Sequence, residues 1–376
     1  MKVAIVHYWL VTMRGGERVV EALCELYPDA DIYTHVATPE MLTDTIRRHR
    51  IQETFIARLP GARRYYQKYL PLMPLALEQL DLRDYDLVIS SECGPAKGVI
   101  TTPRTLHVCY CHSPMRYVWD MYWDYLCDVS KPMRPLARAL LHYIRRWDLA
   151  SAFRVDHFMA NSEFVARRIH KHYRRDAEVI HPPVDTDAFG LAESADDYYL
   201  LVGALVRYKR ADLAVRAFNR AGKQLVVIGD GEQLVDLRRL AGPTVEIMGR
   251  QPASVIREKY SRCRALIFPG EEDFGIVPVE AMASGRPVIA YGRGGALETV
   301  VEGRTGIFFD EQTEDSLLAA IERFEQVEGT FDPAEIRRHA LRFDRQVFKE
   351  KVRSRVEEWL REQRATLTRP VGSRQA

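Results

Sequence analysis

Two glutamates in the stretch GEEDFGIVPVEAMASGRPVIA (270–290) are the residues whose type and spacing best suggest chemistry. Glu272 and Glu280 lie eight positions apart, with a glycine and a proline between them. The apolar runs RALIFP and PVIAY on either side predict two buried strands, which places Glu272 in a loop and Glu280 on the short helix that follows. Carboxylates accept hydrogen bonds, so two of them flanking one ligand would suit a polyhydroxylated phosphate ester such as a nucleotide sugar.

The residues between the glutamates predict how that helix begins. Pro278 suits the first turn, so the helix should start around Ile276–Pro278 and hold Glu280 within its first turn. Gly275 lets the backbone approach a ligand closely, and the N–H groups of a helix start attract oxygens that carry negative charge. The alternative is that both glutamates are solvated carboxylates, favoured at this place by the helix dipole.

Other predicted strands also end in glycine or in polar residues. Lys209 follows the strand expected at 197–205, Gly229-Asp230-Gly231 ends the next strand, and Gly249 ends the one after. In open parallel sheets ligands bind at the carboxyl ends of the strands, so these loops should lie along one edge. This neighbourhood favours a ligand site over two unrelated surface glutamates.

Short apolar runs alternate with amphipathic segments along the chain, which predicts α/β structure with two parallel sheets. The expected strands are 2–8, 31–37, 85–92, 105–113, 155–162, 177–185, 197–205, 224–229, 244–249, 264–268 and 287–291. The expected helices are 15–27, 133–152, 163–173, 210–222, 232–242 and 252–263, then a long charged helix at 343–362 and a frayed tail from 365. Two such units joined near HPPVD (181–185) would make a protein of two lobes with a cleft.

Composition and charge exclude several classes of protein. The 376 residues include 54 basic and 52 acidic side chains, and a net charge of +2 argues against a general nucleic-acid binder. MKVAIVHYWL lacks the features of a signal peptide, and no apolar stretch approaches the ~18 residues of a membrane span, so a cytoplasmic protein is expected. The six cysteines are expected to be free thiols, and CYCH (109–112) lacks a second ligand pair, so no metal site is predicted.

The stretch EDFGIVPVEAMASGRPVIA resembles the E-x7-E signature of retaining GT-B glycosyltransferases, family four of the glycosyltransferases. The resemblance covers nearly the whole chain, through RGGERVVEAL, HSPMRYVWD, ANSEFVARRI, VIHPPVD, VGALVRYKRADLAVRAF, VIGDGE, MGR and YGRGGALETVVEGRTGIFF. Within the family, CHSPMRYVWD and YKRADLAVRAFN are most similar to bacterial mannosyltransferases of O-antigen and exopolysaccharide assembly.

That resemblance implies two Rossmann-like domains facing each other across a cleft. Residues 1–182 would bind the acceptor, and residues 183–342 would bind the nucleotide sugar. Residues 343–376 would hold a helix that returns to the N-terminal domain, together with the frayed tail.

The resemblance also implies roles for individual residues. Glu272 would bind hydroxyls of the donor sugar, Glu280 the ribose, and Lys209 the diphosphate, where a cation offsets charge that builds up on the leaving group. His112 would reach the donor sugar from the N-terminal domain, although taken alone it would be an ordinary core or loop histidine. The remaining implied contacts are backbone N–H groups of Phe274, Gly275 and Ile276, the loop glycines Gly15 and Gly16, and Trp119 and Asp120 on the acceptor side.

One position departs from the family pattern. The family often has an arginine directly after the glycine that ends the strand, and this chain has Ala204 there. Arg207 or Arg210 could supply the second phosphate cation, while Arg207 could equally be a plain surface charge. Arg250, after a strand end, could flank the base, and Glu298 is either a donor contact or a helix-start carboxylate.

The implied reaction is sugar transfer with retention of anomeric configuration. The donor's own phosphate oxygen would take the acceptor proton, with no metal and no cofactor. The predicted function is transfer of mannose from GDP-mannose to a lipid-linked saccharide in polysaccharide or O-antigen synthesis. The alternatives are a UDP-hexose donor, or an inactive nucleotide-sugar-binding protein, which Ala204 suggests. A dinucleotide oxidoreductase is disfavoured because the first strand leads to no G-x-G-x-x-G.

The segment RLPGARRYYQKYLPLMPLALEQL (58–80) suggests contact with a membrane. It combines basic residues and tyrosines with an apolar run, which is typical of an interfacial segment, and ordinary solvated surface is the alternative. A lipid-linked acceptor would suit such a segment, so we expect peripheral binding to the anionic inner face of the plasma membrane. The residues concerned are Arg58, Arg63, Arg64, Tyr65, Tyr66, Lys68 and Tyr69.

Overall fold

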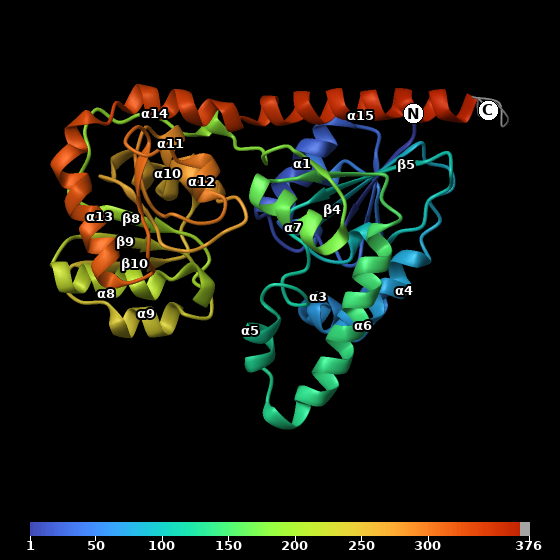
Figure 1. Ribbon diagram of the computed structural model, residues 1–376, viewed down its shortest axis with the longest axis horizontal. Coiled ribbons are helices and arrows are strands. Elements are labelled where there is room, and N and C mark those ends of the chain that lie inside the picture. Colours follow the sequence, from blue (N-terminus) through green and yellow to red (C-terminus); the bar gives the residue numbers. More distant parts are fainter. Residues whose placement is uncertain (369–376) are drawn as a thin grey trace. The chain divides into compact units, whose positions relative to one another are not determined.

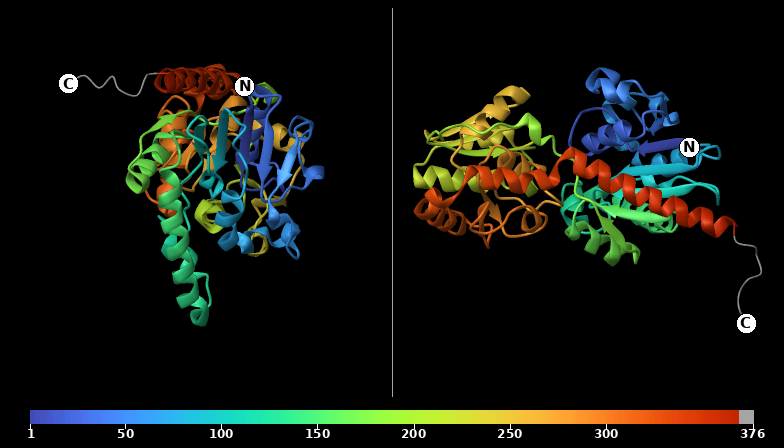
Figure 2. Two further views of the ribbon diagram at one scale, coloured as in Figure 1. Left: turned by 90° about the vertical axis from the view of Figure 1, so that its right-hand side faces the viewer. Right: turned by 90° about the horizontal axis from the view of Figure 1, so that it is seen from above.

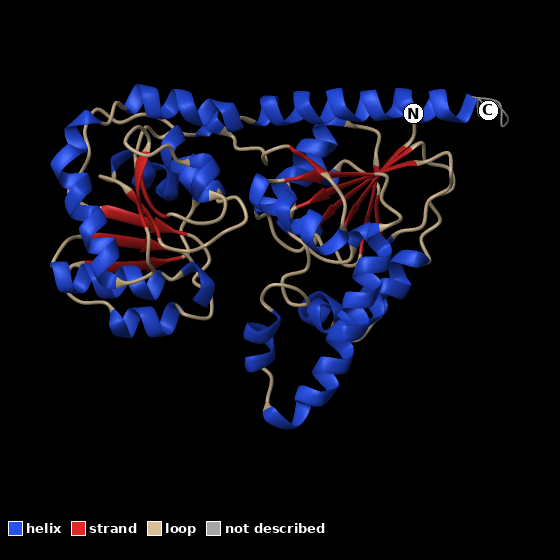
Figure 3. Ribbon diagram, in the orientation of Figure 1, coloured by secondary structure: helices blue, strands red, loops and turns tan. Residues whose placement is uncertain are grey.

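The computed structural model describes residues 1–368 of the chain. It divides into two compact units (Figure 1). Unit 1 comprises Met1–Pro183 and the chain from Phe348 onward, and unit 2 comprises Val184–Val347. Each unit contains one parallel β-sheet with helices packed against it (Figure 3), so the predicted α/β class with two parallel sheets is confirmed.

The sheet of unit 1 has seven strands in the order β3-β2-β1-β4-β5-β6-β7, and all neighbours are parallel. The strands are β1 (Val3–His7), β2 (Asp31–Thr34), β3 (Ile51–Glu53), β4 (Leu87–Glu92), β5 (Leu106–Cys111), β6 (His157–Ala160) and β7 (Ala177–Val179). The helices are α1 (Gly15–Leu26), α2 (Asp44–Arg47), α3 (Ala62–Tyr65), α4 (Met73–Glu78), α5 (Tyr122–Cys127), α6 (Arg134–Ala152) and α7 (Glu163–Tyr173). Strand numbers therefore rise in both directions from the junction of β1 and β4.

A continuous apolar core explains why these segments fold together. All five residues of β1, VAIVH, are buried, as expected for a central strand covered on both faces. The long helix α15 (Arg345–Thr368) joins the same core, because Phe348, Val352, Val356 and Leu360 recur every four residues and pack on it. The predicted return of the C-terminal helix to the N-terminal domain is confirmed.

The end of that helix corrects one expectation. The frayed tail was expected from residue 365, but α15 continues to Thr368. The rest of the predicted tail, residues 369–376, lies outside the described residues.

Helices α5 and α6 form a projecting hairpin, called here the arm (residues 122–146). Figures 1 and 2 both show α5 and the first half of α6 extending away from the rest of unit 1. The middle of α6 is anchored through Ile144, which packs with Met115 and Val118, and through Arg145, whose Nε donates to the carbonyl of Val118 at 2.6 Å. The sequence predicted the long helix α6 but not the short helix α5.

The sheet of unit 2 has six strands, all parallel, in the order β10-β9-β8-β11-β12-β13. They are β8 (Tyr199–Val202), β9 (Leu225–Ile228), β10 (Val245–Gly249), β11 (Leu266–Phe268), β12 (Val288–Tyr291) and β13 (Gly306–Phe309). The helices are α8 (Ala211–Ala221), α9 (Leu234–Leu240), α10 (Ala253–Arg262), α11 (Ile276–Ala283), α12 (Ala296–Thr299), α13 (Glu314–Val327) and α14 (Pro333–Ala340). Strand β13 and helices α12 to α14 were not predicted, since periodicity alone does not assign a four-residue apolar run such as GIFF.

Candidate active site

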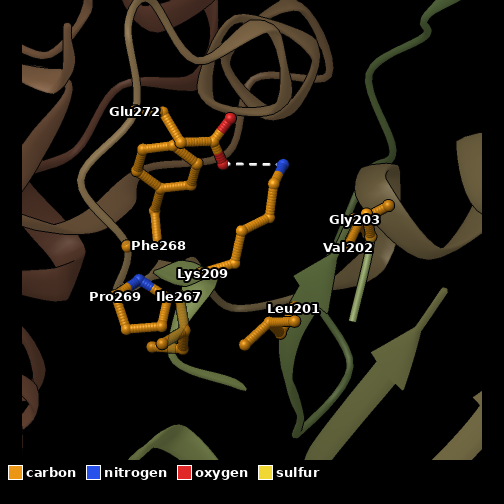
Figure 4. A pocket seen from close by; sticks show the side chains of 10 residues that line it. Leu201, Val202, Gly203, Lys209, Ile267, Phe268, Pro269 and Glu272 are labelled. Atoms are coloured by element: carbon orange, nitrogen blue, oxygen red, sulfur yellow. Dashed lines mark ion pairs between the residues drawn. The ribbon is translucent and has the colours of Figure 1, made fainter. Parts of the chain in front are cut away.

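A small pocket lies at the point in the sheet of unit 2 where the strand order reverses. Strand β8 has β9 on one side and β11 on the other, so strand numbers rise away from this junction in both directions. In open parallel sheets ligands bind at the carboxyl ends of strands at such a switch point. The pocket is lined by residues at the ends of β8 and β11 and in the loops that follow them: Leu201, Val202, Gly203, Ala204, Lys209, Ile267, Phe268, Pro269, Gly270 and Glu272 (Figure 4).

Lys209 and Glu272, both predicted site residues, form an ion pair in this pocket. Nζ of Lys209 lies 2.8 Å from Oε1 of Glu272, and the two side chains keep 19% and 18% of their surface exposed. Lys209 ends the short 3-10 turn Arg207–Lys209 after β8, and Glu272 lies in the loop between β11 and α11. A pair this far buried is screened less by salt than a surface pair, yet both groups keep exposed surface through which a ligand could reach them.

Two close backbone contacts hold these loops. A Cβ atom on Gly270 would lie 2.8 Å from Cα of Lys209, and one on Gly295 would lie 2.3 Å from Cα of Phe274. Neither position has room for a side chain, so glycine is required for this packing. The N–H of Gly295 also donates to the carbonyl of Glu272 at 2.9 Å. The sequence alone assigned no role to Gly270 or Gly295. The feature that could have pointed to Gly295 is the glycine pair in YGRGGALETV.

Helix α11 begins at Ile276, as predicted, after Gly275 in the left-handed conformation with φ of 86°. Glu280 is the fifth residue of the helix, one position beyond the first turn in which it was predicted. Oε2 of Glu280 accepts a hydrogen bond from the hydroxyl of Tyr260 at 2.8 Å. Burial, together with the charge of Glu280, raises the pKa of Tyr260 well above its usual value, so this hydroxyl remains a donor that orients Glu280. Sequence analysis did not single out Tyr260, which looked like one apolar position on α10.

The remaining predicted donor residues of unit 2 lie around this pocket or on neighbouring loops. Ala204 lines the pocket, and Arg207 is exposed in the same turn as Lys209. The guanidinium of Arg210 contacts Oε1 of Gln312 at 3.3 Å and Oδ1 of Asp212 at 3.4 Å. Outside the pocket lining, Arg250 is exposed after β10 and Glu298 is partly buried on α12.

A second group of predicted residues meets at the switch point of unit 1. His112 follows β5, and its Nε2 lies 2.9 Å from Oγ of Ser91 in β4. Gly15 and Gly16 begin α1, which follows β1, and a Cβ atom on Gly16 would lie 3.6 Å from Nε2 of His112. The structure therefore brings His112 and the glycine loop together.

His7, which the sequence did not single out, adds a buried imidazole to this group. Its Nδ1 lies 2.9 Å from the carbonyl oxygen of Ser91, so Nδ1 carries the proton, and its Nε2 has no hydrogen-bond partner among residues 1–368. Burial, and then the charge of His112, lower the pKa of His7 to about 3, so the ring is neutral. The sequence feature that could have pointed to His7 is a polar residue at the end of the apolar run VAIVH. The contact of His7 with Ser91, however, depends on the register between β1 and β4.

Trp119 and Asp120 are held by contacts within unit 1. Nε1 of Trp119 donates to the buried carboxylate of Asp148 at 2.7 Å. Asp120 forms an ion pair with Arg168. Arg168 also donates to Oγ of Ser113, the residue after His112, at 3.0 Å. The two predicted acceptor-side residues thus belong to the network that supports the loop after β5.

Residues 1–368 contain neither a metal-binding cluster nor a membrane-spanning helix. Within that range no group of three or more His, Cys, Asp and Glu side chains could hold a metal ion. None of the helices described there is long and apolar enough to cross a membrane. All six cysteines are free thiols, as predicted.

Two family models match adjacent parts of the chain. The model described as Glycosyltransferase Family 4 matches residues 13–188, and the model described as Glycosyl transferases group 1 matches residues 185–340. Both models describe glycosyltransferases and together they match residues 13–340, so the chain is a glycosyltransferase.

Individual relatives match only parts of the chain. A GDP-mannose-dependent alpha-mannosyltransferase of Mycolicibacterium smegmatis is 35% identical over 122 residues, which cover 32% of each chain. An alpha-1,3/1,6-mannosyltransferase of Candida glabrata is 26% identical over 202 residues, covering 39% of this chain and 44% of the relative. The chain spans about half or less of the length of these curated relatives.

A solved structure matches nearly the whole chain. The Anabaena protein HepE in complex with UDP superposes with a TM-score of 0.71 at 15% identity, over 95% of this chain and 100% of that one. Structural neighbours of this kind have the GT-B fold, so the predicted fold class is confirmed.

Proposed function

We propose that the chain is a retaining glycosyltransferase that transfers mannose from GDP-mannose to a lipid-linked saccharide. The observation that carries the proposal is the ion pair of Lys209 and Glu272 at the switch point of unit 2. It places a cation and a hydrogen-bond acceptor side by side, next to the start of a helix. A nucleotide sugar needs these three features, because it combines a diphosphate with many hydroxyl groups.

Lys209 and Glu272 take different parts of that donor in this proposal. The ammonium of Lys209 offsets the charge that builds up on the leaving diphosphate, and Glu272 accepts hydrogen bonds from the sugar hydroxyls. The backbone N–H groups at the start of α11, in Phe274, Gly275 and Ile276, hold the sugar and the diphosphate.

Glu280 takes the ribose in this proposal. Its Oε2 accepts a hydrogen bond from the hydroxyl of Tyr260 at 2.8 Å, which orients the carboxylate. Arg207 and Arg210, which follow β8 in the same loop as Lys209, are the two candidates for the second phosphate cation in place of the family arginine.

His112 is proposed as a further catalytic residue on the family resemblance. Nε2 of its ring lies 2.9 Å from Oγ of Ser91, and Nδ2 of Asn161 donates to its backbone carbonyl at 2.9 Å, so His112 is held in place within unit 1. His112→Ala should lower turnover while leaving the binding of free GDP unchanged.

Retention follows from the proposed chemistry if the donor's phosphate oxygen accepts the proton of the attacking hydroxyl on the face that the diphosphate leaves. Lys209 would stabilise that oxygen throughout the reaction, and no protein nucleophile is required.

The donor base is the part of the proposal with a specific rival. The GDP-mannose-dependent relative supports GDP-mannose, whereas the UDP complex of the Anabaena protein makes a UDP-hexose the second candidate. A nucleotide-sugar-binding protein without catalysis is the candidate of another class, and Ala204 in the pocket lining is the feature behind it.

The proposed acceptor places the enzyme at a membrane surface. Residues Arg58, Arg63, Arg64 and Lys68 are exposed on unit 1, and no acidic residue occurs between 58 and 72. Such a segment is attracted to anionic lipids, which supports peripheral binding at the inner face of the plasma membrane.

Thermal unfolding with GDP, UDP and ADP tests the nucleotide part, because a ligand that binds the native state raises the apparent Tm. GDP should raise the Tm most, and a larger effect of UDP would select the second candidate. No shift with millimolar nucleotide would contradict the proposal. Initial rates of mannose release from GDP-mannose then distinguish an enzyme from an inactive binder.

A further inference from the structure

The tip of the arm, defined here as residues 123–136, carries large apolar side chains in contact with solvent. The most exposed is Trp123, which keeps 67% of its surface accessible, followed by Leu136 with 63%. Tyr125 and Met133 are also exposed, at 46% and 49%. Exposed apolar groups gathered at one place mark an interaction surface, whereas isolated ones are ordinary.

The turn of the arm is held in shape, so this exposure is not the result of a loose chain end. Nε of Arg134, at the start of α6, donates to the carbonyl of Val129 at 3.1 Å, and Nη2 donates to the carbonyl of Cys127 at 3.3 Å. These bonds fix the start of α6 against the end of α5, and therefore present the apolar side chains on one preformed tip.

The arm also carries an excess of basic side chains. Between residues 122 and 146 the arm has five basic side chains and two acidic ones, in a chain whose net charge is +2. The basic segment 58–72 continues this surface, because its Leu70 packs on the same cluster as Leu140 and Leu141 of α6. Together the two segments contain nine basic and two acidic residues, concentrated on one part of unit 1.

We propose that the arm inserts its apolar tip into the interfacial region of an anionic lipid bilayer. Tryptophan and tyrosine prefer the depth of the headgroups, and methionine and leucine enter the acyl boundary. Arginine and lysine along the arm and along segment 58–72 remain at the level of the lipid phosphates. The arm thus supplies the apolar part of membrane binding, and the basic segment supplies the electrostatic part.

A second copy of the chain is the other occupant that an apolar tip would suit. The excess of basic residues disfavours it, because two copies meeting tip to tip would bring like charges together. An anionic bilayer has the opposite charge and accommodates both the apolar and the basic side chains.

Vesicle binding tests the proposal directly. The variant Trp123→Ser/Leu136→Ser should bind vesicles of phosphatidylcholine and phosphatidylglycerol about tenfold or more weakly than wild type in a sedimentation assay. The matched control is Ile100→Ser/Leu367→Ser, which removes two apolar residues of unit 1 that are also about half exposed, at 52% and 51%, but lie outside the arm. The control should bind like wild type, and both variants should keep the wild-type Tm.

Depth can be measured through tryptophan fluorescence. Trp123 is the one exposed tryptophan among the five in the chain, all of which the structure describes. Brominated lipids should quench part of the wild-type emission, and Trp123→Phe should lose that quenchable part while still binding vesicles.

Three results would overturn the proposal. The first is equal vesicle binding by wild type and by the arm variant. The second is quenching that persists unchanged in Trp123→Phe. The third is conversion of a dimer to a monomer by the arm substitutions with no loss of vesicle binding, which would assign the tip to a second copy of the chain. The proposal rests on the membrane location given under the proposed function, but none of these results depends on nucleotide binding, so the proposed donor chemistry is tested separately.

Discussion

The ammonium of Lys209 and the carboxylate of Glu272 lie 2.8 Å apart, so the two residues proposed for the diphosphate and for the sugar are paired with each other. This contact has two opposing effects on a nucleotide. Glu272 holds Lys209 in position, and its negative charge also offsets the charge that would attract a phosphate. The effect of Glu272 on a free nucleotide should therefore be small, while its effect on a bound sugar should be large.

The first prediction separates the two glutamates by their ligands. Glu280→Ala should weaken binding of free GDP roughly 10- to 150-fold, because a hydrogen bond to a charged group contributes about 1.5–3 kcal/mol. Glu272→Ala should leave GDP affinity near wild type while lowering turnover of the nucleotide sugar, since GDP lacks the transferred sugar whose hydroxyls Glu272 binds. Calorimetry with GDP and initial rates with the donor measure the two effects.

Tyr260→Phe is the matched control, because it removes the hydroxyl that orients Glu280 and leaves the carboxylate in place. It should reduce GDP affinity by less than Glu280→Ala does. Equal losses of GDP affinity in the Glu272 and Glu280 variants would contradict this division of roles. No loss in either would make the pair ordinary solvated carboxylates.

The second prediction concerns the cation. Lys209→Ala should lower turnover by on the order of 10²–10³-fold, because it removes charge stabilisation at the leaving group. The fold should persist, since the side chain is at the edge of the sheet and is partly exposed. Arg207→Ala, measured beside it, should have a smaller effect. Wild-type turnover of the Lys209 variant would assign the role to an arginine of the same loop.

Much of the fold was predictable because a parallel sheet covered on both faces requires continuous apolar strands. The five buried residues of β1 are one example, and the buried run LVVI of β9 is another. The loops of the pocket were predictable for a related reason. Lys209 and Glu272 each follow such a run, so their places at one edge of one sheet follow from strand order.

The contacts that shape the site were not predictable, because they join segments whose relative position depends on tertiary packing. His7 and Ser91 are 84 positions apart and meet only through the register of β1 and β4. Gly295 packs on Phe274 because two loops from neighbouring strands cross at van der Waals distance. No local pattern encodes either contact.

The third prediction tests the basic segment of unit 1. Changing Arg63, Arg64 and Lys68 together to Glu should weaken binding to anionic vesicles, because each basic residue near such a surface contributes about 1 kcal/mol. Added salt should weaken wild-type binding in the same direction. Sedimentation with vesicles at two ionic strengths measures both effects.

Arg63 also donates to the carbonyl of Ala37 at 3.0 Å, so its replacement changes local structure as well as charge. The double variant Arg64→Glu/Lys68→Glu avoids that contact and should show most of the loss. Arg48→Glu/Arg104→Glu, with two exposed residues elsewhere on unit 1, is the matched control and should bind like wild type. Unchanged vesicle binding by the double variant would show that segment 58–72 is ordinary solvated surface with no role in membrane binding.

The last prediction concerns acid stability, and it follows from three histidines buried in unit 1. Burial lowers the pKa of His7 and of His35 to about 3 and that of His107 to about 4. Their pKa in the unfolded chain is about 6.5, so below that pH the unfolded state binds more protons than the native state. The free energy of unfolding should therefore fall as the pH drops from 6.5 to 5, by about 2 kcal/mol for each ring.

Two buried acids act in the opposite direction. Burial raises the pKa of Glu92 to about 7, so the native state takes up a proton there between pH 7 and the unfolded value near 4.5. This uptake stabilises the native state at pH 5 by about 2 kcal/mol. Burial also raises the pKa of Glu17, which acts in the same direction, so the net loss should be at most about 4 kcal/mol. Urea unfolding followed by tryptophan emission reports on unit 1 alone, because all five tryptophans belong to it. His35→Gln should remove about one third of the histidine contribution, and a stability that stays constant from pH 7 to pH 5 would show that these rings are not neutral in the folded protein.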